Sequence, residues 1–158
     1  MAAGRSPEWW FYHLTGAPLE RAAGPLLAKC LEKGWRVLAV SPDPVRRTAL
    51  DETLWTFDEH AFLPHACDDA EGSDPARQPI LISAATANRN TADAVFLMDG
   101  VSLAPDAPFA RCMVMFDDAD KATRTVARAQ FKAAKSAGLT CRYFQQTPKG
   151  GWKEAGSS

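Results

Sequence analysis

Short apolar segments alternate with longer amphipathic segments along most of the chain, and this alternation limits the fold more than any other feature. Several of the predicted strands are apolar on both faces. Those in the middle of the chain are Arg36 to Val40, Ile80 to Ser83, Ala94 to Met98 and Arg111 to Phe116. Because a strand of that kind is buried on both sides, the pattern predicts a three-layer α/β fold, with a mostly parallel sheet and helices on both faces.

The first half of the chain also predicts an opening strand and two helices. Trp9 to Leu14 predicts the strand, and the apolar spacing from Leu19 to Leu31 predicts a helix that ends at Gly34. A second helix opens at Pro42 to Pro44. It places three apolar side chains along one side, namely Val45, Leu50 and Leu54.

The second half has a less regular beginning. No pattern is visible from Thr56 to Pro79, so we expect a long acidic loop there. A long helix is predicted from about Ala119 to Ala137, ending at Gly138. Cys141 to Gln146 predicts the closing strand, with a last short strand near Trp152. We expect one domain over residues 1–158, with a flexible tail from about residue 154.

Composition excludes several classes of protein. The 158 residues are 46% hydrophobic and 23% charged, which is typical of a globular chain. The 18 basic and 19 acidic residues give a net charge of −1, which disfavours binding of nucleic acid by the whole surface. Direct binding by a local basic stripe stays as a third alternative, but no direct nucleic-acid binding is expected. No apolar run approaches the roughly 20 residues of a membrane span. The four cysteines form no chelating pair and fit a reducing compartment. We therefore expect a soluble, cytoplasmic protein without membrane contact.

The turn after the first strand lacks the residues that hold a phosphate. Thr15-Gly16-Ala17-Pro18 has neither the glycine spacing of a dinucleotide-binding turn nor the lysine and hydroxyl residue of a phosphate loop. Pro18 also removes a backbone N–H that such a loop would use. The fold is therefore predicted to be nucleotide-binding-like without a phosphate loop, and no cofactor is expected.

Three aspartates offer an alternative function. Asp117 and Asp118 follow the strand Val114 to Phe116, and Asp99 ends the preceding strand in a similar way. Such carboxylates could hold Mg²⁺ in a phosphotransfer or hydrolytic enzyme. The simpler interpretation, which we favour, is that Asp117 or Asp118 caps the following helix.

A second cluster of possible metal ligands lies in the acidic loop. His60, His65 and Cys67 are close in sequence, but their spacing matches no tetrahedral zinc site. We interpret both histidines as ordinary loop residues, and we expect no metal site and no catalytic residue.

The long C-terminal helix carries the clearest binding signal. Small residues share one side and suit a helix lying close to a sheet: Ala122, Val126, Ala129, Ala133 and Ala137. Positive residues and one aromatic form an outward stripe on the other: Arg124, Arg128, Phe131, Lys132 and Lys135. A basic stripe with an apolar socket suits an acidic peptide that ends in a hydrophobic residue. A solvated basic face remains an equal alternative at this point.

An aromatic cluster follows the second helix. Trp55, Phe57 and Phe62 precede Pro64, and exposed aromatic residues of this kind are typical of interface anchors. They would equally serve as the lid of a small satellite core, so both interpretations stay open.

The chain resembles the chi subunit family of bacterial DNA polymerase III, nearly from end to end. Gly34-Trp35-Arg36-Val37-Leu38 is similar to the family's entry into the second strand. Leu50 to Trp55, followed by Phe62-Leu63-Pro64-His65, is similar to its most recognisable motif. Ala127-Arg128 with Phe131-Lys132 and Ala137-Gly138 is similar to its last helix.

This resemblance implies a non-catalytic replication adaptor of the clamp-loader complex. Chi proteins bind the acidic, phenylalanine-terminated tail of single-stranded DNA-binding protein. The resemblance implies that Arg124, Arg128 and Lys132 pair with that tail, and that Phe131 forms part of an apolar socket. The family often has tyrosine at the position of Phe131. Asp117 is expected near the socket, where it would weaken the binding of an anionic tail.

The resemblance implies a second binding surface as well. In the family this surface binds the psi subunit, which links chi to the clamp loader, and the matching positions are Trp55, Phe62 and Pro64. Psi or an equivalent clamp-loader component is therefore an expected partner. An accessory helicase is another candidate user of the same surface.

Overall fold

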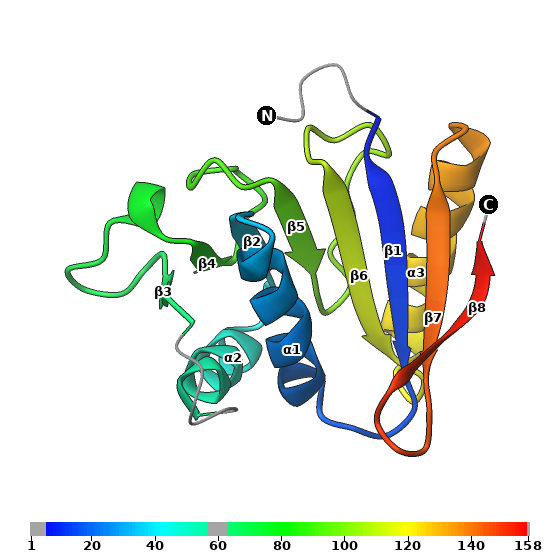
Figure 1. The fold of residues 1–158 in the computed structure, drawn as a ribbon, viewed down its shortest axis with the longest axis horizontal. Coiled ribbons are helices and arrows are strands. Elements are labelled where there is room, and N and C mark those ends of the chain that lie inside the picture. The colour runs from blue at the N-terminus through cyan, green and yellow to red at the C-terminus, as the bar shows by residue number, and fades with distance from the viewer. Residues whose placement is uncertain (1–5, 57–62, 158) are drawn as a thin grey trace.

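The computed structural model describes residues 6–56 and 63–157, and eight strands of this part of the chain form one sheet (Figure 1). The strand order is β3-β4-β2-β5-β6-β1-β7-β8. Every pair is parallel except β7 with β8. The strands are β1 (Glu8–Leu14), β2 (Val37–Val40), β3 (His65–Cys67), β4 (Ile80–Ser83), β5 (Ala94–Leu97), β6 (Arg111–Asp117), β7 (Cys141–Gln146) and β8 (Trp152–Ser157).

Helices cover both faces of the sheet, so the predicted three-layer architecture is confirmed. Figure 1 shows α1 (Leu19–Glu32) in front of the sheet and α3 (Lys121–Ser136) behind it. The helix α2 (Pro44–Thr56) packs beside α1. Side chains of β1 alternate between the two cores: Tyr12 and Leu14 face α1, whereas Trp9 and Phe11 face α3. None of the helices in the described residues has the length and apolar composition that a membrane-spanning helix needs.

The second helix confirms two of its three predicted apolar contacts. Leu50 and Leu54 are buried one turn apart, and Pro44 is the first helical residue, where its missing N–H costs nothing. Val45, however, is 75% exposed. It lies five positions before Leu50, and that spacing turns its side chain well away from the buried side of a helix with 3.6 residues per turn.

Two parts of the chain are more ordered than the sequence predicts. Within the expected acidic loop, His65–Cys67 forms β3 at the sheet edge, and Pro75–Arg77 forms one turn of 3₁₀ helix. A three-residue strand is too short to show a periodic pattern. The expected flexible tail from about residue 154 is instead the continuation of β8, which pairs with β7 through Ser157. Its polar sequence hides this pairing, because backbone hydrogen bonds and the Arg142–Glu154 ion pair hold it.

The last helix begins two residues later than expected, at Lys121. Asp120 caps it, since its carboxylate accepts hydrogen bonds from the backbone N–H groups of Ala122 (3.1 Å) and Thr123 (3.2 Å). Neither Asp117 nor Asp118 is the cap, which corrects the prediction. Gly138 follows the helix with a φ of +77°, as expected of a C-terminal stop.

Candidate functional site

The face that α3 turns toward the sheet determines what its basic residues do. Ala127, Gln130 and Ala134 are the buried residues of this helix. The predicted small-residue face is wrong, because Ala122, Ala129 and Ala137 are exposed. A polar residue lies at the centre of the buried face instead. Gln130 donates a hydrogen bond to the Leu103 carbonyl and accepts one from its N–H, both at 2.9 Å. A fully paired amide is tolerated in a core, and residue type alone does not reveal it.

Phe131 lies at the border of this buried face rather than on an outward stripe. Its ring packs edge-on against Phe11, with 5.2 Å between ring centroids, and against Tyr143 at 6.2 Å. The ring is therefore half-buried, and only part of it faces solvent. Arg128 and Arg124 lie about one and two turns before it, along the same flank of α3.

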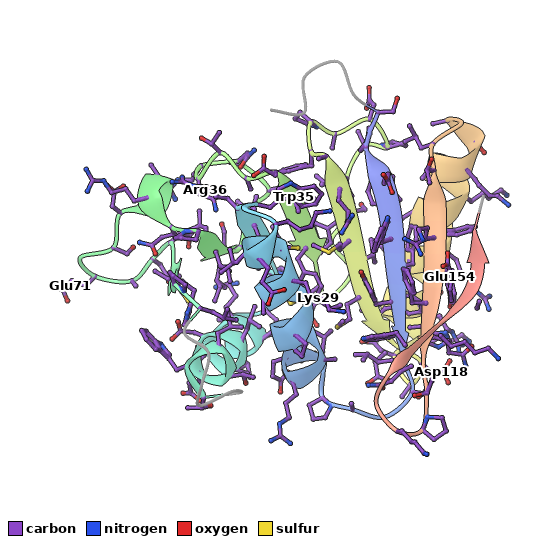
Figure 2. All side chains as sticks on the ribbon, viewed as in Figure 1. Lys29, Trp35, Arg36, Glu71, Asp118 and Glu154 are labelled. Atoms are coloured by element: carbon purple, nitrogen blue, oxygen red, sulfur yellow. The ribbon has the colours of Figure 1, made fainter. Side chains whose placement is uncertain are left out.

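A cavity of about 210 Å³ opens where this flank meets the sheet. We call it the Arg128 pocket. Its lining comes from β1, β6, the loop after β6, α3 and β7: His13, Phe116, Asp118, Arg124, Ala127, Arg128, Phe131 and Tyr143. Figure 2 shows Asp118 at the edge of the sheet where β1 and β6 end. In a parallel sheet, this carboxyl edge is where ligands commonly bind.

A chain of hydrogen bonds crosses the Arg128 pocket. Nε2 of His13 lies 2.8 Å from Oδ1 of Asp118, and the Tyr143 hydroxyl lies 2.7 Å from Nδ1 of the same ring. Because a carboxylate only accepts, Nε2 of His13 carries the proton, and Tyr143 donates to Nδ1 when the ring is neutral. Nη1 of Arg124 lies 3.5 Å from the Asp118 carboxylate.

These contacts set the charge of the site. The hydrogen bond from His13 lowers the pKa of Asp118 below its usual value, and Arg124 acts in the same direction. Burial raises the pKa of the Tyr143 hydroxyl, so that hydroxyl stays neutral at pH 7. The pocket thus combines two guanidinium groups with one carboxylate, over a floor of aromatic rings.

Most of the predicted tail-binding residues meet in this pocket. Arg124, Arg128 and Phe131 line it, whereas Lys132 is exposed further along α3 and is not part of the lining. The acidic residue beside the socket is Asp118 and not the expected Asp117. The carboxylate of Asp117 instead accepts a hydrogen bond from the backbone N–H of Ala119 at 2.9 Å.

Sequence reasoning did not connect His13 and Tyr143 with the site. His13 is 105 residues from Asp118 and 130 residues from Tyr143 in the chain. The one signal in the sequence was His13 itself, a polar ring within a predicted strand. The alternation of strand side chains assigns it to the same face as Trp9 and Phe11.

The three aspartates of the alternative function do not form a metal site. Asp99 lies against Arg46, with Nε 3.1 Å from Oδ2, and accepts a hydrogen bond from the Ser41 hydroxyl at 2.6 Å. Across residues 6–56 and 63–157, no group of three His, Cys, Asp or Glu side chains is placed to hold a metal ion. The structure therefore gives the magnesium-dependent alternative no support.

The second predicted surface is only partly within the described residues. Trp55 is 55% exposed, and its ring centroid lies 4.7 Å from that of His65. His65 is buried, with ring nitrogens 2.6 Å from the Leu63 carbonyl and 3.1 Å from the Asp51 carbonyl, which supports a structural role. Pro64 lines a separate, open depression together with Trp35. Phe57, His60 and Phe62 lie outside the described residues.

Comparison with known proteins connects this geometry to one family. Residues 7–142 match the family described as DNA polymerase III chi subunit, HolC. The chain is also similar to a "Probable DNA polymerase III subunit chi" from Rickettsia prowazekii (strain Madrid E), with 22% identity over 150 residues. That alignment covers 90% of this chain and 88% of the relative.

Proposed function

The chain belongs to the DNA polymerase III chi subunit family, and we propose that it acts as a replisome adaptor whose Arg128 pocket binds the acidic, phenylalanine-terminated tail of single-stranded DNA-binding protein. Chi subunits are accessory subunits of the polymerase III holoenzyme and are not themselves catalytic. The proposal concerns what this accessory subunit holds and where it holds it.

The charge of the Arg128 pocket supports an anionic ligand. Arg128 is exposed and forms no ion pair within the described residues, so its five N–H donors are available to a carboxylate. Lys132, one helical turn further along α3, extends the positive charge away from the pocket. A carboxyl terminus and the acidic side chains before it would face this surface together.

The aromatic lining supports a hydrophobic terminal residue. Phe116, Phe131 and Tyr143 form the apolar part of the lining, and the cavity of about 210 Å³ exceeds the ~150 Å³ that suffices for a benzene ring. A phenyl side chain placed there would be desolvated while its carboxylate stays near Arg128. This combination of one ring-sized cavity and one unpaired guanidinium is the observation that carries the proposal.

For the clamp-loader side of the adaptor, we propose the surface around Trp55 and Pro64. An exposed tryptophan is a typical interface anchor, and Trp55 is the most exposed aromatic side chain in the described residues. The partner proposed for this surface is psi or an equivalent clamp-loader component, with an accessory helicase as an alternative user. This surface adjoins α2 and the β3 edge of the sheet, whereas the Arg128 pocket lies at β6, β1 and β7, so the two proposed surfaces share no residue.

A comparison of two forms of the partner tests the proposed function. The immobilised chain would be exposed to intact single-stranded DNA-binding protein and to the same protein without its last ten residues, in surface plasmon resonance. We expect concentration-dependent binding of the intact protein alone, with weaker binding at higher salt. Equal binding of the two forms would refute tail recognition.

A further inference from the structure

A second cavity lies on the opposite face of the sheet from the Arg128 pocket. Its volume is about 150 Å³, and we call it the Trp10 cavity. Its apolar walls come from α1 and from strands β1, β6, β7 and β8: Trp10, Tyr12, Leu26, Met113, Phe144 and Trp152. A cavity of this volume with apolar walls accommodates one benzene ring. The Trp10 cavity is therefore large enough for one aromatic or branched apolar group.

Three positive side chains line this cavity, and no carboxylate does. Lys29 lies in the last turn of α1, Lys33 is the C-cap of that helix, and Arg111 is the first residue of β6. Figure 2 shows Lys29 on α1 and Trp35 just beyond the end of that helix. The Arg111 guanidinium carbon lies 3.6 Å from the centroid of the Trp10 ring.

Arg111 lacks the counter-ion that a partly buried guanidinium normally has. Within the described residues it forms no ion pair, and its buried Nε has no hydrogen-bond partner. That Nε is enclosed by protein and out of reach of a ligand, but no carboxylate among the described residues neutralises the charge of the guanidinium. The part of Arg111 that lines the cavity therefore presents an uncompensated positive charge, which favours a negatively charged ligand.

The neighbouring acids do not neutralise these cations. Glu154 is paired with Arg142 through two hydrogen bonds of 2.9 and 2.7 Å, and Glu8, which accepts a hydrogen bond from the Trp10 indole at 3.1 Å, does not line the cavity. Burial raises the pKa of both Tyr12 and Cys30, so these groups are neutral at pH 7. The cavity consequently keeps a net positive charge.

The aromatic walls favour a ring that enters the cavity over a base that stacks on the sheet. Guanidinium groups already lie over Trp10, from Arg111 and, at 4.4 Å, from Arg142. Tyr12 and Phe144 stack on each other, with ring centroids 5.2 Å apart and an angle of 13°. Binding of single-stranded nucleic acid usually needs free ring faces. The rings of this cavity leave few faces free for a base.

We propose that the Trp10 cavity binds a carboxylate carried on a single aromatic or branched apolar group. The apolar group would fill the cavity, and the carboxylate would pair with Arg111, Lys29 and Lys33. Two sources supply this chemistry: a free small aromatic acid, and the terminal residue of a protein chain. The site is separate from the Arg128 pocket and lies on the α1 side of the sheet.

N-acetyl-L-phenylalanine and its neutral amide form a matched pair of probes for this site. Both would be titrated into the Arg128→Ala variant, so that the Arg128 pocket contributes little, and followed by the indole N–H signals in two-dimensional NMR. We expect the acid to shift the Trp10 and Trp152 signals with a Kd of roughly 0.1–1 mM, a range typical of a ligand of this size. The amide should bind at least about tenfold more weakly.

Three further variants in the same background locate the site. Arg111→Gln should weaken the acid about tenfold or more. The exposed pair Lys29→Gln with Lys33→Gln should weaken it several-fold without loss of folding. The charge-matched control is Arg77→Gln with Lys149→Gln, two exposed cations that do not line the cavity, and it should bind like the parent.

The proposal is overturned if acid and amide bind equally, if neither cation variant weakens the acid, or if no shift appears at millimolar acid. It is also overturned if a thymidine oligonucleotide displaces the acid, because phosphate and base would then be the ligand. A Phe-terminated peptide that binds this background more tightly than the free acid identifies a chain terminus as the ligand. If the peptide does not bind, the ligand is the free acid. These results do not depend on tail binding at the Arg128 pocket, so they would test the Trp10 cavity even if the wild type failed to bind the tail.

Discussion

The carboxylate of Asp118 lies 2.8 Å from Nε2 of His13, although 105 positions separate the two residues in the chain. The same carboxylate also lies 3.5 Å from Nη1 of Arg124. One of the two guanidinium groups of the Arg128 pocket therefore already has a counter-ion. An acidic tail that binds there competes with a negative charge of the protein itself.

Asp118→Asn should strengthen the binding of an acidic peptide ending in Pro-Phe. The substitution removes the competing charge and leaves an amide oxygen that still accepts from His13. We expect roughly a twofold to fivefold lower Kd at low salt, the size usual for an exposed charge pair. Isothermal titration calorimetry would measure it, with Asp69→Asn as a remote control of equal charge. An unchanged or higher Kd for Asp118→Asn would contradict the competition.

The same carboxylate predicts a pH dependence of stability. Because the His13 hydrogen bond lowers the pKa of Asp118 from 3.8, the stability it contributes is complete above pH 3.8 and is lost as the pH falls through the lowered value. The wild type should therefore have a higher urea midpoint than Asp118→Asn at pH 6, and the difference should shrink as the pH falls below 3.8. It will be small, since the side chain is 54% exposed. A difference that grew toward acid pH would be the wrong sign.

The orientation of α3 is tested by two adjacent residues. Gln130→Leu leaves the N–H and carbonyl of Leu103 without partners in a buried position, so it should lower the free energy of unfolding by about 2–4 kcal/mol. Ala129→Leu adds an apolar side chain to the exposed face and should change it by less than about 0.5 kcal/mol. Urea unfolding measures both. The reverse order of effects would place the alanine face against the sheet.

Cys67 provides a chemical test of β3. Burial and the nearby carboxylate of Asp51 raise the pKa of its thiol to about 11. At pH 8 its thiolate fraction should then be about a hundredfold lower than that of a thiol with the ordinary pKa of 9. Alkylation by iodoacetamide should keep accelerating above pH 10. The other three cysteines are buried, and the Cys67→Ser variant gives their background rate. A rate that levels off near pH 9 would mean that Cys67 is more exposed than in this structure.

The alternation of strands and helices was sufficient to predict the fold class, because strands such as β2 and β4 are apolar on both faces and have only one stable environment. The edges of the sheet were harder to predict. β3 has three residues and β8 is polar, and both are held by backbone pairing with a neighbour rather than by an apolar pattern.

Part of the candidate site could be predicted and part could not. The positive residues of α3 were recognisable because they share one helix. The side of that helix that packs on the sheet could not be predicted. Gln130 can be buried there because it pairs with the backbone of Leu103, and no local sequence pattern identifies that partner. His13 and Tyr143 join the site only through parallel pairing of β1 with β6 and β7.

Titration of a Pro-Phe-terminated acidic peptide into the Arg128→Ala variant tests tail binding at the Arg128 pocket most directly. Arg128 is exposed, so its loss should not affect folding, and Arg77→Ala is the control for the removal of one exposed positive charge. We predict a Kd at least about tenfold higher for Arg128→Ala than for the wild type, and an unchanged Kd for Arg77→Ala. Equal Kd values for the wild type and Arg128→Ala would contradict binding of the tail in this pocket.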